Sequence, residues 1–169
     1  LNMKLRLTDL HLGFNKKRYH FKSNDLPDKG ITFIEDQIYC DLSSKKNKNG
    51  YSISGKLLAK TECECVRCLD KNIIEHVLTI NFYLVKEKKI ENMNEDIDSI
   101  SFNENQEEIE IDDLLTDLIG LAEPLKPLCS DACKGLCSVC GNNKNSKTCS
   151  CTIPQRNTVW DELKKIKIK

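Results

Sequence analysis

Six of the chain's ten cysteines lie within 23 residues near its C-terminal end. Cys137 and Cys140 form a C-x-x-C followed directly by Gly141, a spacing that lets one tight turn aim two thiolates at one metal. Cys149 and Cys151 return as a C-x-C after a loop rich in Asn and Ser, residues that favour chain reversal. Because four thiolates suit a tetrahedral Zn²⁺, the spacing predicts a zinc site, with a disulfide cluster as the alternative.

A second set of cysteines is divided between two distant parts of the chain. Cys65 and Cys68 form another C-x-x-C, while Cys129 and Cys133 form a C-x-x-x-C just before the module described above. These four thiols can complete a second site, which would fasten a predicted sheet to the cysteine-rich module. The competing interpretation of Cys65 and Cys68 is a thioredoxin-like redox pair. That chemistry needs a βαβ context, whereas the neighbouring segments favour antiparallel strands.

Basic side chains accompany these cysteines. Arg67 stands inside C-V-R-C, where its guanidinium group can either offset thiolate charge or contact a phosphate. Lys134, Lys144 and Lys147 interleave with the cysteine-rich module, and they can likewise offset thiolate charge or face RNA. The candidates for RNA contact are these four residues and three lysines near the C-terminus: Lys164, Lys165 and Lys167.

Several segments resemble one protein family in the order in which they occur. LAEPLKPLC, CKGLCSVCGNNKN and CSC resemble the YceD family, CVRCL resembles its upstream C-x-R-C-L element, and RNTVWDELKKIK resembles its closing helix. The resemblance implies a cytoplasmic or plastid protein that is needed for the accumulation of large-subunit, 23S-type ribosomal RNA.

Charge is unevenly distributed along a chain whose formal net charge is zero. Residues 91–117 hold eleven acidic residues and no Lys or Arg, whereas residues 124–169 hold nine basic and three acidic residues. The first 22 residues are also basic. Because an acidic run cannot approach phosphates favourably, any RNA contact is expected on the basic termini and the cysteine-rich module.

Membrane and secretory classes are not indicated. No apolar run approaches the roughly 20 residues that span a bilayer, and the first residues lack the apolar stretch of about 7–15 residues of a signal peptide. Ten cysteines in such a chain favour a reducing compartment, where thiols hold metal rather than pair. The sequence therefore predicts a cytoplasmic protein with no membrane partner.

The elements that would position the cysteines predict an α+β fold. A short strand and a loop are expected in residues 1–22, and apolar alternation predicts strands over residues 31–42, 51–60 and 73–85, with a hairpin turn at Asn49-Gly50. Helical spacing begins near Asp112 and stops before Pro124, and a short final helix is expected at residues 158–167.

The expected architecture is thus a small antiparallel sheet, one central helix, a Cys-rich zinc module and a short C-terminal helix. We divide it into an antiparallel β domain with the C-x-R-C element (1–85), an acidic flexible segment (86–111), and a part with the helix, the zinc knuckle and the C-terminal helix (112–169).

No catalytic motif is recognisable: the chain lacks G-x-S-x-G, a P-loop, G-x-G-x-x-G and H-E-x-x-H. All-cysteine zinc sites are closed and structural, whereas a catalytic zinc keeps an open position. The sequence therefore favours a non-enzymatic ribosome-biogenesis factor with one or two structural Zn²⁺ ions and no small-molecule substrate. Its expected partner is ribosomal RNA or a large-subunit ribosomal protein. The alternative is a zinc- or thiol-dependent redox enzyme that uses the C-x-x-C pairs.

Overall fold

A computed structural model describes residues 3–87 and 98–152 of the protein. Its main element is a six-stranded sheet in the order β2-β4-β5-β6-β7, with β3 paired to β5 beside this path. The strands are β2 (Phe14–Lys22), β3 (Thr32–Phe33), β4 (Gln37–Asn47), β5 (Gly50–Glu64), β6 (Lys71–Lys86) and β7 (Ser99–Phe102). All neighbours are antiparallel except β6 and β7, which run parallel.

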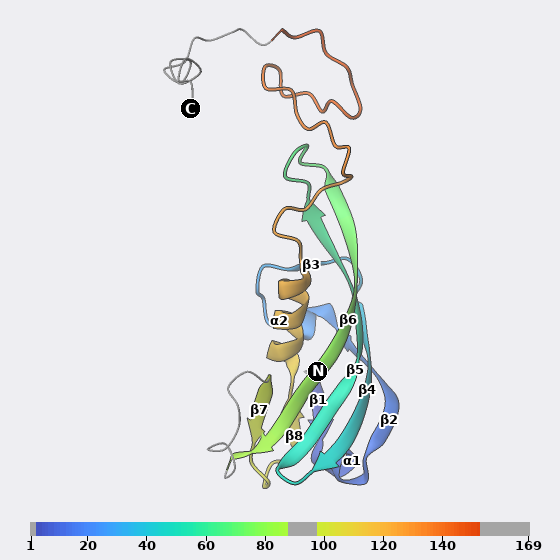
Figure 1. Ribbon diagram of the computed structural model, residues 1–169, viewed down its shortest axis with the longest axis vertical. Helices are drawn as coiled ribbons and strands as arrows, with labels where there is room; N and C mark the ends of the chain where they lie inside the picture. Colours follow the sequence, from blue (N-terminus) through green and yellow to red (C-terminus); the bar gives the residue numbers. More distant parts are fainter. Residues whose placement is uncertain (1–2, 88–97, 153–169) are drawn as a thin grey trace, which may run out of the picture.

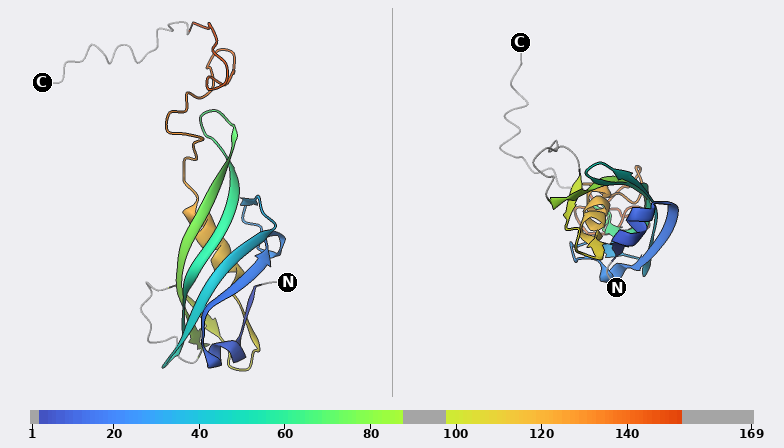
Figure 2. Two further views of the ribbon diagram at one scale, coloured as in Figure 1. Left: turned by 90° about the vertical axis from the view of Figure 1, so that its right-hand side faces the viewer. Right: turned by 90° about the horizontal axis from the view of Figure 1, so that it is seen from below.

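The remaining elements lie against the inner, concave face of this sheet. They are a two-stranded antiparallel sheet of β1 (Lys4–Arg6) and β8 (Glu108–Glu110), the helices α1 (Leu7–Leu12) and α2 (Asp112–Ala122), and a 3-10 turn, η1 (Ser23–Asp25). Viewed from below, the sheet curls around the helices, whereas from the side of β2 and β4 the helix α2 lies behind the strands (Figure 2). The outer face of the sheet is therefore left uncovered by the other described elements.

The core forms between the inner sheet face and the helices because apolar residues alternate along the strands and recur on one side of α2. On β5 the inward residues Tyr51, Ile53 and Leu57 are buried, and on α2 Leu115 and Ile119 are fully buried. Burial of each such side chain contributes about 1.5–3 kcal/mol. The core thus fixes α2 along the sheet, and with it the start of the segment that leads to residues 129–152.

The β5–β6 hairpin reaches beyond the other strands. Its pairing runs without interruption from Gly50↔Val85 to Glu64↔Lys71. The tip of the hairpin projects from the body of the molecule, and the cysteine-rich segment lies beyond this tip (Figure 1). The molecule is therefore elongated, with α1 and the β4–β5 turn near one end and the cysteines near the other.

Several expectations from the sequence are confirmed. The strands expected over residues 51–60 and 73–85, the hairpin turn at Asn49-Gly50 and the helix that begins at Asp112 are all present, so the α+β class with a Cys-rich module agrees with the structure. The strand expected over residues 31–42 is divided into β3 and β4. The expected helix at residues 158–167 lies outside the described residues, as do Lys164, Lys165 and Lys167.

Other expectations need correction. The sheet is larger than expected and mixed rather than purely antiparallel, and the expectation of one central helix is not confirmed because α1 is a second helix and α2 lies along one sheet face. Residues 14–22 form β2 instead of a loop. This strand is at the edge of the sheet, where polar residues are favoured and the apolar alternation is weak.

The acidic segment also contains structure. Within residues 86–111 the described part includes β7 and β8, whose inward residues Phe102 and Ile109 are buried. Single buried residues between exposed acids carry too little periodic signal to predict strands this short. The division into three parts at residues 85 and 111 stays a prediction. None of the described helices has both the length and the apolar character that crossing a lipid bilayer would require.

Candidate metal centres

The eight cysteines predicted as ligands form two groups of four. We call Cys65, Cys68, Cys129 and Cys133 the inner cluster, and Cys137, Cys140, Cys149 and Cys151 the outer cluster. Within each cluster the four Sγ atoms lie within 4.8 Å of one another. All ten cysteines are free.

Sulfur separations test whether these groups fit a metal. In the inner cluster, Sγ of Cys65 lies 3.8 Å from Sγ of Cys133, and Sγ of Cys68 lies 3.6 Å from Sγ of Cys129. A tetrahedral zinc with Zn–S bonds of about 2.3 Å places its sulfurs about 3.8 Å apart, whereas a disulfide joins them at about 2.0 Å. The inner thiols therefore have the spacing of metal ligands rather than of a bonded pair.

The hairpin tip delivers the first two inner ligands. The backbone N–H of Cys65 donates to Asp70 O at 2.9 Å, and the N–H of Leu69 donates back to Cys65 O at 2.8 Å. Leu69 adopts a left-handed conformation with φ of 63°, which is uncommon for a branched residue. The tight turn between β5 and β6 thus directs Cys65 and Cys68 toward the same point.

Backbone contacts hold the other two inner ligands against this turn. The N–H of Val66 donates to Pro127 O at 2.9 Å, and the N–H of Leu136 donates to Arg67 O at 2.9 Å. The guanidinium group of Arg67 donates to the carbonyl oxygen of Cys133 at 3.1 Å. Arg67 therefore has a positioning role in this junction, besides the phosphate contact considered from the sequence.

The outer cluster begins with a similar turn. The N–H of Cys137 donates to Asn142 O at 2.8 Å, and the N–H of Gly141 donates to Cys137 O at 2.9 Å. Gly141 has a φ of 73°, a conformation that glycine adopts without a Cβ penalty. The turn that the sequence predicts at C-x-x-C-G is thus present.

Two asparagines connect the clusters, and the sequence did not identify them as part of the site. The amide of Asn145 donates to Sγ of Cys133 at 3.3 Å, and the amide of Asn143 donates to Asp70 Oδ2 at 2.6 Å. The same Asp70 carboxylate lies 3.4 Å from Sγ of Cys68. From the sequence these asparagines predict only a turn, because their partners are 12 and 73 residues away.

The electrostatics of the thiols differ within each cluster. Burial acts to raise the pKa of Cys65, but backbone N–H groups of Cys129 and Arg67 lower it to about 6. Backbone N–H groups of Cys140 and Val139 lower the pKa of Cys137 to about 6. The nearby Cys140 thiol, with burial, raises the pKa of Cys151 to about 12.

These shifts have one physical reading. The side-chain amide of Asn145 also lowers the pKa of Cys133, and Cys133 in turn raises the pKa of Cys129, as Cys137 raises the pKa of Cys149. A thiol that ionises readily thus disfavours ionisation of a neighbour by its negative charge. A divalent cation removes that penalty by stabilising all four thiolates together. The donor set and its charge therefore fit a metal ion with a preference for sulfur.

The basic side chains of the module are mostly exposed. Lys134 and Lys147 are exposed and Lys144 is half-buried, and among the described residues none of the three has an acidic partner. Backbone contacts hold all three in the outer loop: the N–H of Lys134 donates to Asn145 Oδ1 at 2.8 Å, and the N–H groups of Lys144 and Lys147 donate to Gly135 O and Asn143 O.

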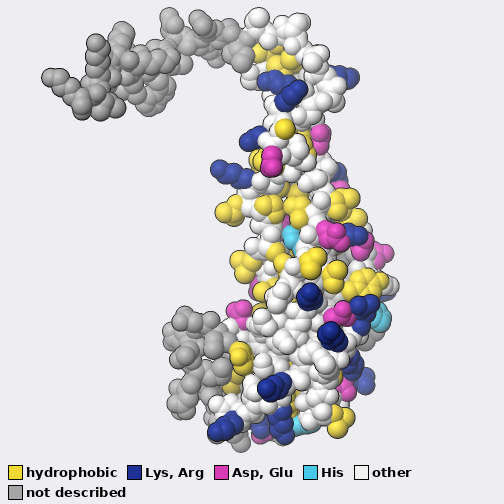
Figure 3. Space-filling model, turned by 45° about the vertical axis from the view of Figure 1, so that its right-hand side comes forward, with side chains coloured by type: hydrophobic (Ala, Val, Ile, Leu, Met, Phe, Trp, Pro, Cys, Tyr) yellow, Lys and Arg dark blue, Asp and Glu magenta, His cyan; other side chains and the backbone are white. Residues whose placement is uncertain are grey.

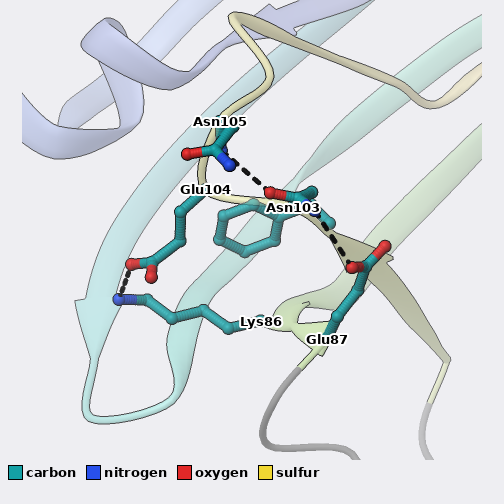
Figure 4. Close-up of a pocket in the computed structure, with 6 residues that line it drawn as sticks. Lys86, Glu87, Asn103, Glu104 and Asn105 are labelled. Atoms are coloured by element: carbon teal, nitrogen blue, oxygen red, sulfur yellow. Dashed lines mark hydrogen bonds and ion pairs between the residues drawn. The ribbon is translucent and has the colours of Figure 1, made fainter.

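A hollow lies at the opposite end of the molecule from the cysteine clusters. It has a volume of about 140 Å³ and is lined by Lys86, Glu87, Phe102, Asn103, Glu104 and Asn105 (Figure 4). Lys86 pairs with Glu104, and the amide of Asn103 donates to Glu87 Oε2 at 3.3 Å. Because these groups engage one another and no cysteine lines the hollow, its residues do not form a recognisable catalytic arrangement.

The sequence is similar to proteins of plants and bacteria. It is 32% identical over 66 residues to the "Large ribosomal RNA subunit accumulation protein YCED homolog 1, chloroplastic" of Arabidopsis thaliana, covering 39% of this chain and 21% of that protein. It is 42% identical over 60 residues to the Zea mays protein of the same name, covering 36% of this chain and 20% of that protein. An uncharacterized protein of Mycobacterium tuberculosis is 30% identical over 103 residues, covering 60% of this chain and 48% of that protein.

The chain thus spans between about a fifth and about half of the length of these curated relatives. No solved structure was found to match it. The family model described as "Large ribosomal RNA subunit accumulation protein YceD" matches residues 53–167, a stretch that contains both cysteine clusters and well over half of the sequence. The chain therefore belongs to the YceD family.

Proposed function

We propose that the protein is a non-enzymatic ribosome-biogenesis factor that supports the accumulation or processing of large-subunit, 23S-type ribosomal RNA. The observation that carries this proposal is the family match, which extends over both clusters. The names of the plant relatives likewise refer to accumulation of the large ribosomal RNA subunit.

In this proposal each cluster holds one structural Zn²⁺. Four cysteines with no histidine or carboxylate ligand form a closed tetrahedral site, which leaves no position for substrate or water. Through the two ions, the eight cysteines hold the hairpin tip, the segment after α2 and the outer loop in one arrangement.

A redox function is less well supported by the geometry. A thioredoxin-like pair sits at a helix N-terminus, which lowers the pKa of the attacking thiol. Cys65 and Cys68 lie instead in the turn between two antiparallel strands, and each is within 4 Å of a cysteine from residues 129–133. An oxidised Cys65–Cys68 pair would have to break up a group of four thiols that is held in place by both segments.

Ribosomal RNA or a large-subunit ribosomal protein is the proposed partner, and the compartment is the one in which ribosomes are assembled, the cytoplasm in a bacterium. Lys134, Lys144 and Lys147 are proposed to contact phosphates, together with Lys164, Lys165 and Lys167. The support is that the three module lysines are free of acidic partners among the described residues and carry charge that RNA would neutralise.

The test is the ratio of large-subunit to small-subunit ribosomal RNA in the native host after removal of the gene. We expect the ratio to fall, with accumulation of large-subunit precursors, and to recover when the wild-type gene is returned. Cys68→Ser should fail to restore it, because it removes an inner ligand. Cys63→Ser is the matched control, since Cys63 lies outside both clusters. An unchanged ratio in the deletion strain would reject the proposed function.

A further inference from the structure

The described Lys and Arg residues fall into two groups, those that pair with a carboxylate and those that do not. Eight described Lys and Arg residues pair with a carboxylate within 4.0 Å: Lys4, Arg6, Lys17, Arg18, Lys29, Lys60, Lys71 and Lys86. Among the described residues, those without such a partner gather mainly at the two ends of the molecule. One group is that of the cysteine-rich module, and the other lies on the sheet.

The sheet group consists of lysines from three strands and a turn. Lys16 belongs to β2, Lys45 to β4, Lys48 to the β4–β5 turn and Lys56 to β5, and all four are exposed. Lys46 of β4 is also exposed, but it is paired with the buried Tyr51 and therefore lies on the inner side of the sheet. The N–H of Lys16 donates to Oγ of Ser43 at 2.9 Å, so the pairing of β2 with β4 brings Lys16 beside a strand that is far away in sequence. We call this part of the outer face the cationic half.

Among the described residues of β2, β4 and β5, the cationic half contains a single carboxylate. It is Asp41, which accepts two hydrogen bonds from Arg18 at 2.8 and 2.9 Å, so that its charge is already neutralised. The floor between the lysines is uncharged and can form hydrogen bonds: Ser43 pairs with Ser54, and Ser54 pairs with Asn81. Figure 3 shows Lys and Arg side chains spread over the lower part of the molecule on a largely uncharged surface.

The spacing of the lysines favours a polyanion over a small anion. Lys56 is paired with Asp41 and Lys45 with Ser52, so these two lysines are four residues apart along the strands. At about 3.3 Å per residue this is about 13 Å, too far for one phosphate group to bridge. A chain of phosphates can contact both.

An exposed apolar row adjoins the cationic half. Tyr39, Leu58 and Val77 are paired side by side across β4, β5 and β6, two residues from the level of Lys56, and they are 41%, 38% and 60% exposed. His20 of β2 is paired with Tyr39 and extends the row. The hydroxyl of Tyr39 donates to Gln37 Oε1 at 3.0 Å, which restrains the ring.

We propose that the outer face of the sheet binds single-stranded RNA, with Lys45, Lys48 and Lys56 contacting phosphates and Tyr39 stacking on a base. A cationic surface beside exposed aromatic rings is the combination by which proteins bind single strands, and a duplex would not offer its bases to the apolar row. The inference rests on the proposed function, since it takes RNA as the partner, but it places a contact surface far from the cysteine clusters.

The experiment uses the full-length, zinc-loaded protein and a fluorescent 20-nucleotide oligouridylate, with binding followed by anisotropy at several salt concentrations. The triple reversal Lys45→Glu, Lys48→Glu, Lys56→Glu should weaken binding at least tenfold. It should also reduce the slope of log K against log salt by about 2, since each phosphate contact in a single strand contributes about 0.7. Tyr39→Ala should weaken binding about fivefold to a hundredfold, the range for one stacked base, while leaving the slope unchanged.

A comparison variant, Lys134→Glu, Lys144→Glu, Lys147→Glu, changes the net charge by the same amount at the other end and tests the contacts proposed for the cysteine-rich module separately from those of the sheet. Unchanged zinc content and circular dichroism ensure that each variant is folded. If the wild type binds RNA and only the comparison variant weakens binding, the sheet surface is wrong and the proposed function stands. Equal affinity for a duplex of the same length, or capture of an acidic protein with no RNA binding, also overturns it. The RNA ratio in the deletion strain tests the proposed function separately.

Discussion

The two cysteine clusters have the same four thiols but different relations to the chain. The inner cluster joins residues that are 61 and 68 positions apart, while the outer cluster is contained within residues 137–151. Because the entropic cost of closing a loop rises with its length, a metal in the inner cluster constrains far more of the chain. The inner cluster thus determines how the module joins the sheet, and the outer cluster shapes one loop.

The clusters also differ in exposure to solvent. Cys65 is fully buried and Cys68 and Cys133 are nearly so, whereas Cys140 and Cys151 are exposed. Contacts between the clusters run through the asparagines of the outer loop, which reach back to Asp70 and Cys133. The inner cluster is therefore part of the tertiary structure, whereas the outer cluster, apart from the buried Cys137, lies nearer the surface, although the two sequence motifs look alike.

The largest expected effect comes from breaking the inner cluster. Cys68→Ser should abolish zinc binding there and release the segment of residues 127–152 from the hairpin tip. Structural zinc in finger peptides contributes about 10–16 kcal/mol, which is more than the contacts around the junction can replace. Zinc analysis should show the loss of one ion, and amide spectra should change at the hairpin tip and throughout the module. Retention of both ions in Cys68→Ser would contradict the assignment of the inner ligands.

A smaller effect is expected from the outer cluster. Cys137→Ser should also lose one zinc ion, but amide signals of the sheet and of the hairpin tip should remain those of the wild type. In the wild-type protein a chelator should remove the zinc of the outer cluster before that of the inner cluster. Cys137→Ser should lack the zinc that is released early. Disturbance of the sheet in this variant would mean that the two clusters are not separable.

The difference between the clusters also explains how much the sequence could predict. The outer set follows from spacing within one loop, and the turn at Gly141 follows from its residue type. The sequence groups Cys65 and Cys68 with Cys129 and Cys133 only because these thiols have no other partners, and not because a contact between the two segments could be predicted. The structure brings these four thiols together, and their binding of zinc stays a prediction.

Other features depend on pairing that no local pattern reveals. The strand β2 is polar because it lies at a sheet edge. The roles of Asn143 and Asn145 arise only when the outer loop is folded against the hairpin tip. In the same way, Lys16 comes to lie beside Ser43 of β4, whose Oγ accepts its N–H, only through the pairing of β2 with β4. The residues that the sequence predicts for RNA contact by number therefore lie in Arg67, the cysteine-rich module and the C-terminal segment.

A residue of the outer loop, Asn145, donates a hydrogen bond to the inner cluster. Asn145→Ala removes the amide that donates to Sγ of Cys133 and the Oδ1 that accepts from the N–H of Lys134. Groups that support metal ligands in this way change metal affinity by about 10–100-fold. Competition with a chelator of known affinity should show the loss at the inner cluster. Asn142→Ala is the control, because Asn142 contributes its backbone carbonyl and not its side chain to the turn. Equal losses in both variants would argue against the contact.

The smallest expected difference separates two glycines with the same backbone conformation. Gly135 and Gly141 have φ of 69° and 73°, so alanine at either is strained by about 1–2 kcal/mol. A Cβ at Gly135 would lie 3.0 Å from Arg67 O, whereas a Cβ at Gly141 meets nothing within 4 Å. That carbonyl already accepts the N–H of Leu136 at the junction with the inner cluster, so it cannot move away freely.

Gly135→Ala should therefore lower the thermal stability of the zinc-loaded protein more than Gly141→Ala, and it should weaken the inner site while the outer site keeps its affinity. Gly141→Ala should affect the outer site alone, because its turn contains only outer ligands. Thermal unfolding and chelator competition on the two variants measure both quantities. If Gly135→Ala weakens only the outer site, residues 134–136 belong to the surface loop. The boundary between the clusters then lies closer to Cys133 than the contacts of Arg67 indicate.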